Sequence, residues 1–207
     1  ASNSSVASSS SYNSNFTSVT GTYGTLKVGA DGTYTYVADQ SASDDLDLND
    51  TATDSFTYTI SDGTATNTAT LIFTVTGIND APVADNETNS VNEDATLTVT
   101  DGTSDVLHGD TDADDSASLT VSAIRTGAED GSGTAGSIGS GLTGTYGTLT
   151  LASDGTYTYV ADQSAADDLD LNDQVTDSFT YTVSDGTATD TATITITVTG
   201  INDAPVA

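Results

Sequence analysis

A long internal repeat is the feature that most constrains how this chain can fold. Residues 21–84 align without a gap with residues 144–207, at an offset of 123 residues, and 52 of the 64 aligned positions are identical. Such a repeat predicts two domains of one fold, a partial repeat at 1–84 that lacks the first strands and a complete repeat at 85–207. A window cut from a longer tandem array would have this organisation. A natural start at Ala1 would instead leave one domain short of strands.

Apolar and polar residues alternate within the repeat, which indicates β-strands. Phe56, Tyr58 and Ile60 alternate with threonines, and the second copy repeats this pattern. Alternation at a period of two places one set of side chains on a buried face and the threonines toward solvent. We therefore expect the repeated tyrosines to pack in the core rather than to form a carbohydrate-binding platform: Tyr34, Tyr36, Tyr157 and Tyr159.

Turn signals separate the alternating runs. Asp31-Gly32 and Ser61-Asp62-Gly63, with their copies, lie between two such runs, as in β-hairpins. Sustained helical periodicity is not evident, so we expect almost no helix. In the complete repeat we expect about seven strands, near 89–92, 95–100, 118–125, 145–151, 155–161, 177–184 and 189–200. The predicted fold is all-β, a tandem of antiparallel β-sandwiches of immunoglobulin type.

Composition excludes several functions. The chain has 2 Lys and Arg residues against 31 Asp and Glu, a formal net charge of -29, so phosphate neutralisation on nucleic acid is not expected. No apolar run approaches the roughly 20 residues needed to cross a bilayer. Cysteine is absent and His108 is the only histidine, so we expect neither disulfides nor a soft-metal site nor an enzymatic centre.

Acidic residues gather in clusters that suit a hard cation. Oxygen-only ligand sets favour Ca²⁺, which takes 6–8 oxygen ligands in flexible geometry. The candidate ligands at the seam between the copies are Asn79, Asp80, Glu93, Asp110, Asp112 and Asp114. The three aspartates of the 110–114 segment would converge only if that segment is a loop. A further acidic run at 44–50, repeated at 167–173, is better explained as a solvated face.

Four successive segments carry a family resemblance: VNEDATLTV, VLHGDTDADDSASLTV, GTYGTLTLASDGTYTYV and DSFTYTVSDGTATDTATITITVTGINDAPV. In this order they resemble the VCBS-type, cadherin-like repeats of giant bacterial surface proteins. The resemblance implies an extracellular, Ca²⁺-stabilised extender domain of an RTX-type adhesin, at the cell surface or secreted. Its partners would be the neighbouring repeats of the same chain.

The resemblance also implies which residues bind the cation. Asp62 matches the aspartate of the cadherin D-x-G loop, and Asn79 and Asp80 match the linker between domains. Glu93 matches the early glutamate of the next domain, whose loop carboxylates are Asp110, Asp112 and Asp114. The equivalents at the other end would form half a site, completed by a following domain: Asp185, Asn202 and Asp203. Because Gly77 and Ala81 replace two cadherin ligands, we expect one or two ions at the seam.

The sequence thus predicts a non-enzymatic, Ca²⁺-binding spacer or adhesive stalk. Two alternatives stay open. An incomplete first sandwich could accept a strand from a neighbouring subunit and build an extracellular filament or surface layer. Binding of surface glycans is a weaker alternative, through Ca²⁺ or exposed tyrosines.

Overall fold

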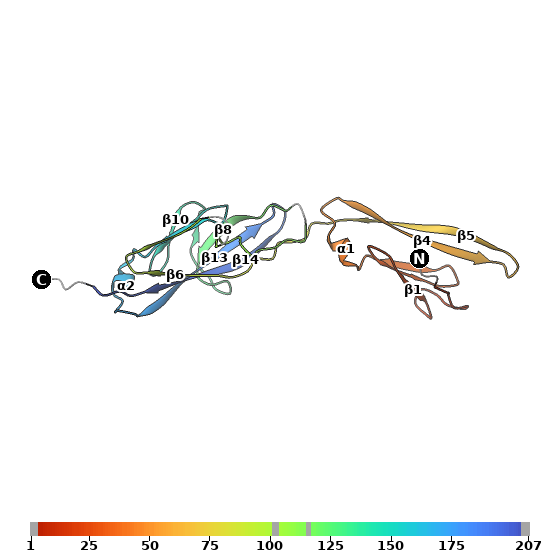
Figure 1. Cartoon of the computed structure of the whole chain (residues 1–207), viewed down its shortest axis with the longest axis horizontal. Coiled ribbons are helices and arrows are strands. Elements are labelled where there is room, and N and C mark those ends of the chain that lie inside the picture. The colour runs from red at the N-terminus through yellow and green to blue at the C-terminus, as the bar shows by residue number, and fades with distance from the viewer. Residues whose placement is uncertain (1–3, 101–103, 115–116, 204–207) are drawn as a thin grey trace. The chain divides into compact units, whose positions relative to one another are not determined.

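The computed structural model describes residues 4–100, 104–114 and 117–203. The chain forms two compact units. Unit 1 comprises Ala1–Asp80 with Ala113–Ser116, and unit 2 comprises Ala81–Asp112 with Ala117–Ala207. The described residues are almost entirely strand and loop, which confirms the predicted all-β class (Figure 1).

Unit 2 is a two-layer β-sandwich. One sheet has the order β10-β11-β12-β7 and the other has the order β6-β14-β13-β8-β9. Neighbouring strands are antiparallel except that β6 runs parallel to β14. The strands are β6 (Glu87–Asn92), β7 (Thr96–Val99), β8 (Thr120–Thr126), β9 (Ala135–Gly136), β10 (Gly141–Thr143), β11 (Thr148–Leu151), β12 (Tyr157–Val160), β13 (Gln174–Ser184) and β14 (Thr189–Thr199).

The core of unit 2 fills the space between these two sheets. Tyr159 and Leu149 come from one sheet, Tyr181 and Ile194 come from the other, and all four are fully buried in one hydrophobic cluster. The alternation in the sequence predicted these inward positions, because successive side chains of a strand point to opposite faces. Tyr157 is also buried, as expected.

Unit 1 contains the strands that the repeat duplicates. One sheet has the order β1-β2-β3, and a separate hairpin pairs β4 with β5 (Figure 1). The strands are β1 (Thr17–Thr20), β2 (Thr25–Val28), β3 (Tyr34–Val37), β4 (Thr51–Ser61) and β5 (Thr66–Thr76). Strands β2 to β5 lie within the repeated residues and correspond to β11 through β14, whereas β1 lies just before the repeat, as β10 does. Tyr36 stacks on Phe73 with ring centroids 4.3 Å apart, so the two sheets of this unit face each other.

Two expectations need correction. In unit 1, Tyr34 was expected in the core but is exposed, because among the described residues no strand covers β3 on that side. The described part of unit 2 has nine strands rather than about seven. The additional strands are the very short β9 and β10, whose residues show little alternation. Both units also contain a four-residue helix, α1 (Ser41–Asp44) and α2 (Ser164–Asp167).

The predicted hairpin turns are confirmed. Gly32 and Gly155 join their flanking strands at φ 84° and 86°, and Gly63 and Gly186 do so at φ 91° and 97°. Side chains with a Cβ rarely adopt this left-handed region, which explains glycine at these turns.

Candidate metal centres

A buried carboxylate lies at the end of unit 2 where strands β6 and β14 finish. Glu93 follows β6 and is only 1% exposed. Its backbone N–H donates to the Thr199 carbonyl at 2.9 Å, and its Oε1 accepts a hydrogen bond from the Ile201 N–H. Its Oε2 is buried and has no hydrogen-bond partner. A buried carboxylate oxygen without a donor is costly unless a cation satisfies it.

Further oxygen atoms surround this end, which we call the C-terminal pole of unit 2. Asn202 follows directly, and its Nδ2 donates to the Asp203 carbonyl at 2.8 Å. The carbonyl of Asp170 lies so close to Gly200 that a Cβ there would be 2.2 Å away. In Figure 1, helix α2 and the C-terminal segment lie at this same end of unit 2. Asn202 and Asp203 directly follow Ile201, whose N–H binds Glu93.

A second acidic group lies at the opposite end of unit 2. Asp110 Oδ1 accepts a hydrogen bond from the Asp85 N–H at 2.9 Å, and its buried Oδ2 has no hydrogen-bond partner. Burial raises the pKa of Asp110 to about 6; the Asp85 N–H opposes this, while the Asp85 and Glu87 carboxylates add to it. These carboxylates repel one another when all are ionised.

In unit 1, the predicted linker residues lie beside one aspartate of the acidic loop. Asp114 is buried, and its Oδ2 accepts a hydrogen bond from the Asp80 N–H at 3.1 Å. Asn79 Nδ2 donates to the Asp80 carbonyl, as Asn202 does to Asp203 in unit 2. Asp110 and Asp114 thus bind different backbone segments, assigned to different units. Asp112 lies between these two aspartates in the sequence, and its side chain is half-buried.

The structure separates three residues that sequence reasoning had grouped with these sites. Asp62 lies in the β4–β5 turn, so the eleven residues of β5, about 36 Å of strand, separate it from Asn79. Asp185 lies in the β13–β14 turn and is separated from Asn202 by β14, which is equally long.

Both turn aspartates have a structural role in their hairpins. Asp62 Oδ1 accepts hydrogen bonds from the Thr64 and Ala65 N–H groups at 2.8 and 2.7 Å, which lower the pKa of its carboxyl. Asp185 Oδ1 makes the same pair of bonds to its own hairpin. Asp185, which was expected to form a half site with Asn202 and Asp203, thus lies at the other end of β14 from them.

Glu93 is the third misplaced residue. The six residues of β6 separate it from Asp85 and Asp110, so it belongs to the C-terminal pole rather than to the end where unit 2 begins. A glutamate near the start of a domain reaches the domain's far end because β6 pairs in parallel with Ile194–Thr199, the second half of β14, and finishes where β14 finishes. The order of residues in the sequence does not show this crossing.

The oxygen atoms at these places are of the kind that binds a hard cation, but they do not form a complete set of ligands. The described residues contain no group of three or more Asp, Glu, His or Cys side chains that could hold a metal ion. The oxygen atoms that are available are carboxylates, amides and carbonyls, the ligands Ca²⁺ prefers. The two basic side chains are engaged elsewhere, since Arg125 donates to the Ala128 and Glu129 carbonyls and Lys27 Nζ lies 4.8 Å from the Phe16 ring centroid.

Sequence reasoning missed the most completely bonded aspartate of each unit. Asp177 Oδ1 accepts from the Thr145 N–H at 2.8 Å, and its Oδ2 accepts from the N–H groups of Tyr146 and Gly147 and from the Tyr159 hydroxyl, at 2.9, 3.1 and 2.7 Å. We call this arrangement the aspartate clamp. At Gly147, a Cβ would lie 2.4 Å from the Tyr159 ring, so only glycine fits.

Unit 1 repeats the aspartate clamp. Asp54 accepts from the N–H groups of Thr22, Tyr23 and Gly24 and from the Tyr36 hydroxyl, at 2.8, 3.1, 3.0 and 2.8 Å. A signal for it exists in the sequence. Asp54 is in phase with Phe56, Tyr58 and Ile60, so the alternation places a carboxylate on the buried face of β4.

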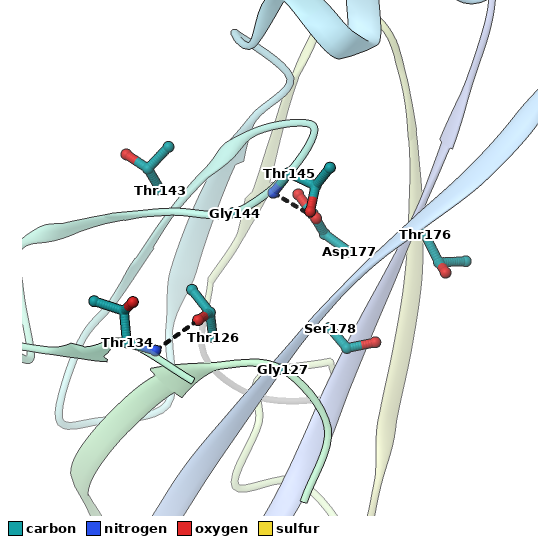
Figure 2. Close-up of a pocket in the computed structure, with 9 residues that line it drawn as sticks. All are labelled: Thr126, Gly127, Thr134, Thr143, Gly144, Thr145, Thr176, Asp177 and Ser178. Carbon is teal, nitrogen blue, oxygen red and sulfur yellow. Dashed lines mark hydrogen bonds between the residues drawn. The ribbon is translucent and has the colours of Figure 1, made fainter. Parts of the chain in front are cut away.

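A cleft of about 470 Å³ lies beside the aspartate clamp of unit 2 (Figure 2). Its nine lining residues are mostly threonines and glycines, with Ser178 and Asp177. Asp177 is the only carboxylate among them, and four donors already occupy it. The cleft therefore offers neither a free general base nor an aromatic ring for a sugar to stack on.

Tandem β-sandwich units with carboxylate and amide oxygens at their ends define the class of cadherin-like repeat proteins. Residues 2–77 and 79–200 each match the family described as bacterial cadherin-like domain. The chain belongs to this family. Bacterial cadherin-like domains are extracellular, and cadherin-like domains generally bind Ca²⁺ and are typically non-enzymatic.

Solved structures similar to the chain include protocadherins and a hydrolase. Mouse clustered PcdhgC3 EC1-3 is 17% identical, with a TM-score of 0.42, over 90% of this chain and 55% of that one. Protocadherin gammaB7 EC3-6 is 12% identical, with a TM-score of 0.43, over 92% and 42%. Endo-fucoidan hydrolase MfFcnA4 is 20% identical, with a TM-score of 0.35, over 90% and 23%.

The chain thus spans about a quarter to just over half of these proteins. No curated protein matches it. Among the described residues, no helix is long and apolar enough to cross a membrane.

Proposed function

We propose that this chain is a Ca²⁺-stabilised extender segment of a large bacterial surface or secreted adhesin of the VCBS and RTX type. Its role would be mechanical and not catalytic, holding a distal binding module away from the cell. Membership of an extracellular cadherin-like family supports this proposal. Repeats that contact only their neighbours suit such a spacer, since they add length without changing the fold.

The observation that carries the proposal is the Glu93 carboxylate. It is buried at the C-terminal pole of unit 2, where the chain leaves the domain, and one of its oxygens has no hydrogen-bond partner. A buried carboxylate oxygen without a hydrogen-bond donor is costly in a sandwich of modest size. A cation bound at the pole accounts for it.

Residues at three places would hold Ca²⁺. Glu93, Asn202 and Asp203 would hold an ion at the C-terminal pole, with water completing its coordination where a following repeat does not supply ligands. Oxygen atoms for the other two places come from Asn79, Asp80 and Asp114 in unit 1 and from Asp85 and Asp110 in unit 2; Asp112 is a further candidate. A doubly charged ion at each place would offset the repulsion among carboxylates in a chain of formal charge -29.

Calorimetric titration with Ca²⁺ tests the metal centre. Glu93→Gln keeps the shape of the side chain but removes its charge, and we expect Ca²⁺ affinity at the pole to fall by about ten-fold or more. Asp130→Asn is the matched control, because it removes one charge from an exposed loop of the same unit. Equal Ca²⁺ affinity in wild type, Glu93→Gln and Asp130→Asn would contradict the proposal.

Small-angle scattering tests the extender role separately from metal binding. If Ca²⁺ stiffens the chain, the profiles in Ca²⁺ and in EGTA will differ, and the maximum dimension will be larger in Ca²⁺. Superimposable profiles at saturating Ca²⁺ would leave a Ca²⁺-binding domain without the proposed mechanical role.

A further inference from the structure

The chain enters and leaves unit 2 on two strands that lie side by side. Strand β6 is the first of the unit and β14 is the last, and they pair in parallel, Glu87–Asn92 with Ile194–Thr199 (Figure 1). We call these six residue pairs the β6–β14 ladder. Because the two strands run in the same direction, the chain enters at one end of the ladder and leaves at the other.

The entering segment is already bound to β14 before the ladder begins. The Ala84 N–H donates to Asp190 Oδ2 at 2.9 Å. Two residues further on, Asn86 Oδ1 accepts a hydrogen bond from the Thr193 N–H at 2.7 Å. Asp190 and Thr193 both belong to β14, so these contacts extend the attachment of the entering segment toward the start of that strand.

The leaving end of the ladder is held in a similar way. The Glu93 N–H donates to the Thr199 carbonyl at 2.9 Å, directly after the last residue pair. The Ile201 N–H then donates to Glu93 Oε1. The segment that enters unit 2 and the segment that leaves it are therefore joined to each other along the full length of the ladder.

This arrangement decides how tension would pass through unit 2. A force that pulls the entering and leaving segments apart acts along both strands in opposite directions. All six residue pairs then carry the load at once, although each hydrogen bond is weak by itself. Strands β7 to β13 lie between β6 and β14 in the sequence, so the force stretches them only after the ladder has broken.

We propose that the β6–β14 ladder is the force-bearing element of the repeat, which keeps unit 2 folded while the chain is under tension. The proposal rests on the extender role, which would place the chain under such tension, and it names the part of the fold that resists it. Forced unfolding is governed by the barrier to unfolding, and breaking the ladder in shear would set that barrier.

A longer ladder in unit 2 does not have this position. Strands β13 and β14 pair over eleven residues, but they are antiparallel and are joined by the turn at Gly186. Only β14 of this pair carries an end of the unit. Tension on the two ends therefore reaches β13 through β14 and not from the opposite direction, so the longer ladder is not sheared.

Single-molecule pulling of the full chain in two directions tests the proposal. The sequence contains no cysteine, so pairs of cysteine handles can be placed at will. Val83→Cys with Asp203→Cys loads opposite ends of the ladder and shears it. Val83→Cys with Thr187→Cys loads the same end and opens the pairs one after another. All three positions are exposed.

The measurement is made in EGTA, so that no bound cation contributes to the resistance. We expect the rupture force of unit 2 to be at least about two-fold higher in the shearing direction than in the peeling direction at the same pulling speed. A sandwich that resists only through its core would give similar forces in both directions.

Two neighbouring residues of β6 provide matched proline variants. The Ser90 N–H donates to Asn89 Oδ1 at 2.9 Å and lies outside the ladder. Alternate residues of a strand face the same neighbour, so the Val91 N–H faces β14, as the Glu93 N–H does. Proline is tolerated on an edge strand where its nitrogen faces solvent, but it removes a bond where the nitrogen faces the ladder.

We therefore expect Val91→Pro to lower the shearing force and Ser90→Pro to leave it close to that of the wild type. Val91 also packs against the core, so Val91→Ala measures the loss of packing alone. Val91→Pro should be weaker in shear than Val91→Ala. The comparison of the two pulling directions uses native strand sequences and does not depend on how the proline variants fold.

Two outcomes would overturn the proposal. One is the same rupture force in the shearing and peeling directions. The other is the same shearing force for Val91→Pro and Val91→Ala. Either result would leave the extender role intact if scattering still shows a change with Ca²⁺. A strong dependence on direction without any response to Ca²⁺ would support the ladder and contradict the proposed Ca²⁺ stabilisation.

Discussion

Units 1 and 2 share 52 of 64 aligned residues, yet they bury those residues very differently. Of the described hydrophobic residues that are buried, only Leu26 and Val75 lie in the strands of unit 1, while unit 2 has a continuous core. The sequence of a strand thus determines which side chains point inward. Burial depends on whether further strands cover that face.

The aspartate clamp, unlike the burial of the strands, is preserved in both units. Its carboxylate, its three backbone donors and its tyrosine all lie within the repeated 64 residues, and its geometry is nearly the same in both units. Contacts contained within the repeat are therefore preserved, whereas contacts made to residues 85–126 are lost. Both halves of this comparison can be tested by substitution.

The largest expected loss of stability comes from replacing the aspartate of the clamp. Asp177→Ala would leave three N–H groups and a hydroxyl without their acceptor inside a closed core, and we expect it to destabilise unit 2 by about 3 kcal/mol or more. Asp54→Ala should cost unit 1 less, because its partner Tyr36 is only half-buried whereas Tyr159 is fully buried. Native-state hydrogen exchange, which reports each unit separately, is the measurement. Equal losses of unfolding free energy in the two units would contradict this difference between them.

Truncation of an inward aliphatic residue should have an intermediate effect. Val183→Ala would leave a cavity in the core of unit 2 and cost about 2 kcal/mol. Ile60→Ala, at the corresponding position, should cost less than about 0.5 kcal/mol, since its side chain is largely in solvent. A comparable loss at Ile60 would mean that the face of unit 1 is covered in solution. The same exchange experiment measures both variants.

The smallest expected difference between the two units is in the ionisation of their clamp tyrosines at alkaline pH. Burial, followed by the hydrogen bond to Asp54, raises the pKa of Tyr36 to about 12. A raised pKa in the folded state gives stability that is complete below the usual tyrosine pKa of about 10 and is lost as pH rises toward about 12. Deeper burial raises the pKa of Tyr159 further.

Tyrosinate absorbance during an alkaline titration checks this prediction. We expect the clamp of unit 1 to ionise before the clamp of unit 2, with Tyr36→Phe and Tyr159→Phe assigning the two steps. Ionisation of both tyrosines in one step would show that the two clamps have the same environment.

The all-β class, the hairpin turns and the inward tyrosines of unit 2 could be predicted from the sequence because they follow from local alternation and turn chemistry. Asp54 and Asp177 could have been found from the same alternation. The exposure of Tyr34 could not, because it depends on strands that are distant in the sequence. Neither could the short strands β9 and β10, which have almost no periodic pattern.

The site was less predictable than the fold, for a topological reason. Glu93 precedes Asp110 by 17 residues in the sequence but lies at the other end of β6. Asp62 and Asn79 are likewise separated by a strand that spans the unit. A strand of eleven residues carries the chain from one end of a sandwich to the other, so proximity in sequence does not mean proximity in space.

Amide exchange at the C-terminal pole of unit 2, compared in Ca²⁺ and in EGTA, tests the central claim most directly. The Ile201 N–H donates to Glu93 Oε1, so a cation held by this carboxylate should slow exchange at Gly200 and Ile201 while leaving the β13–β14 turn unchanged. We predict this local protection in the wild type and its loss in Glu93→Gln. Identical exchange at the pole with and without Ca²⁺ would contradict the account.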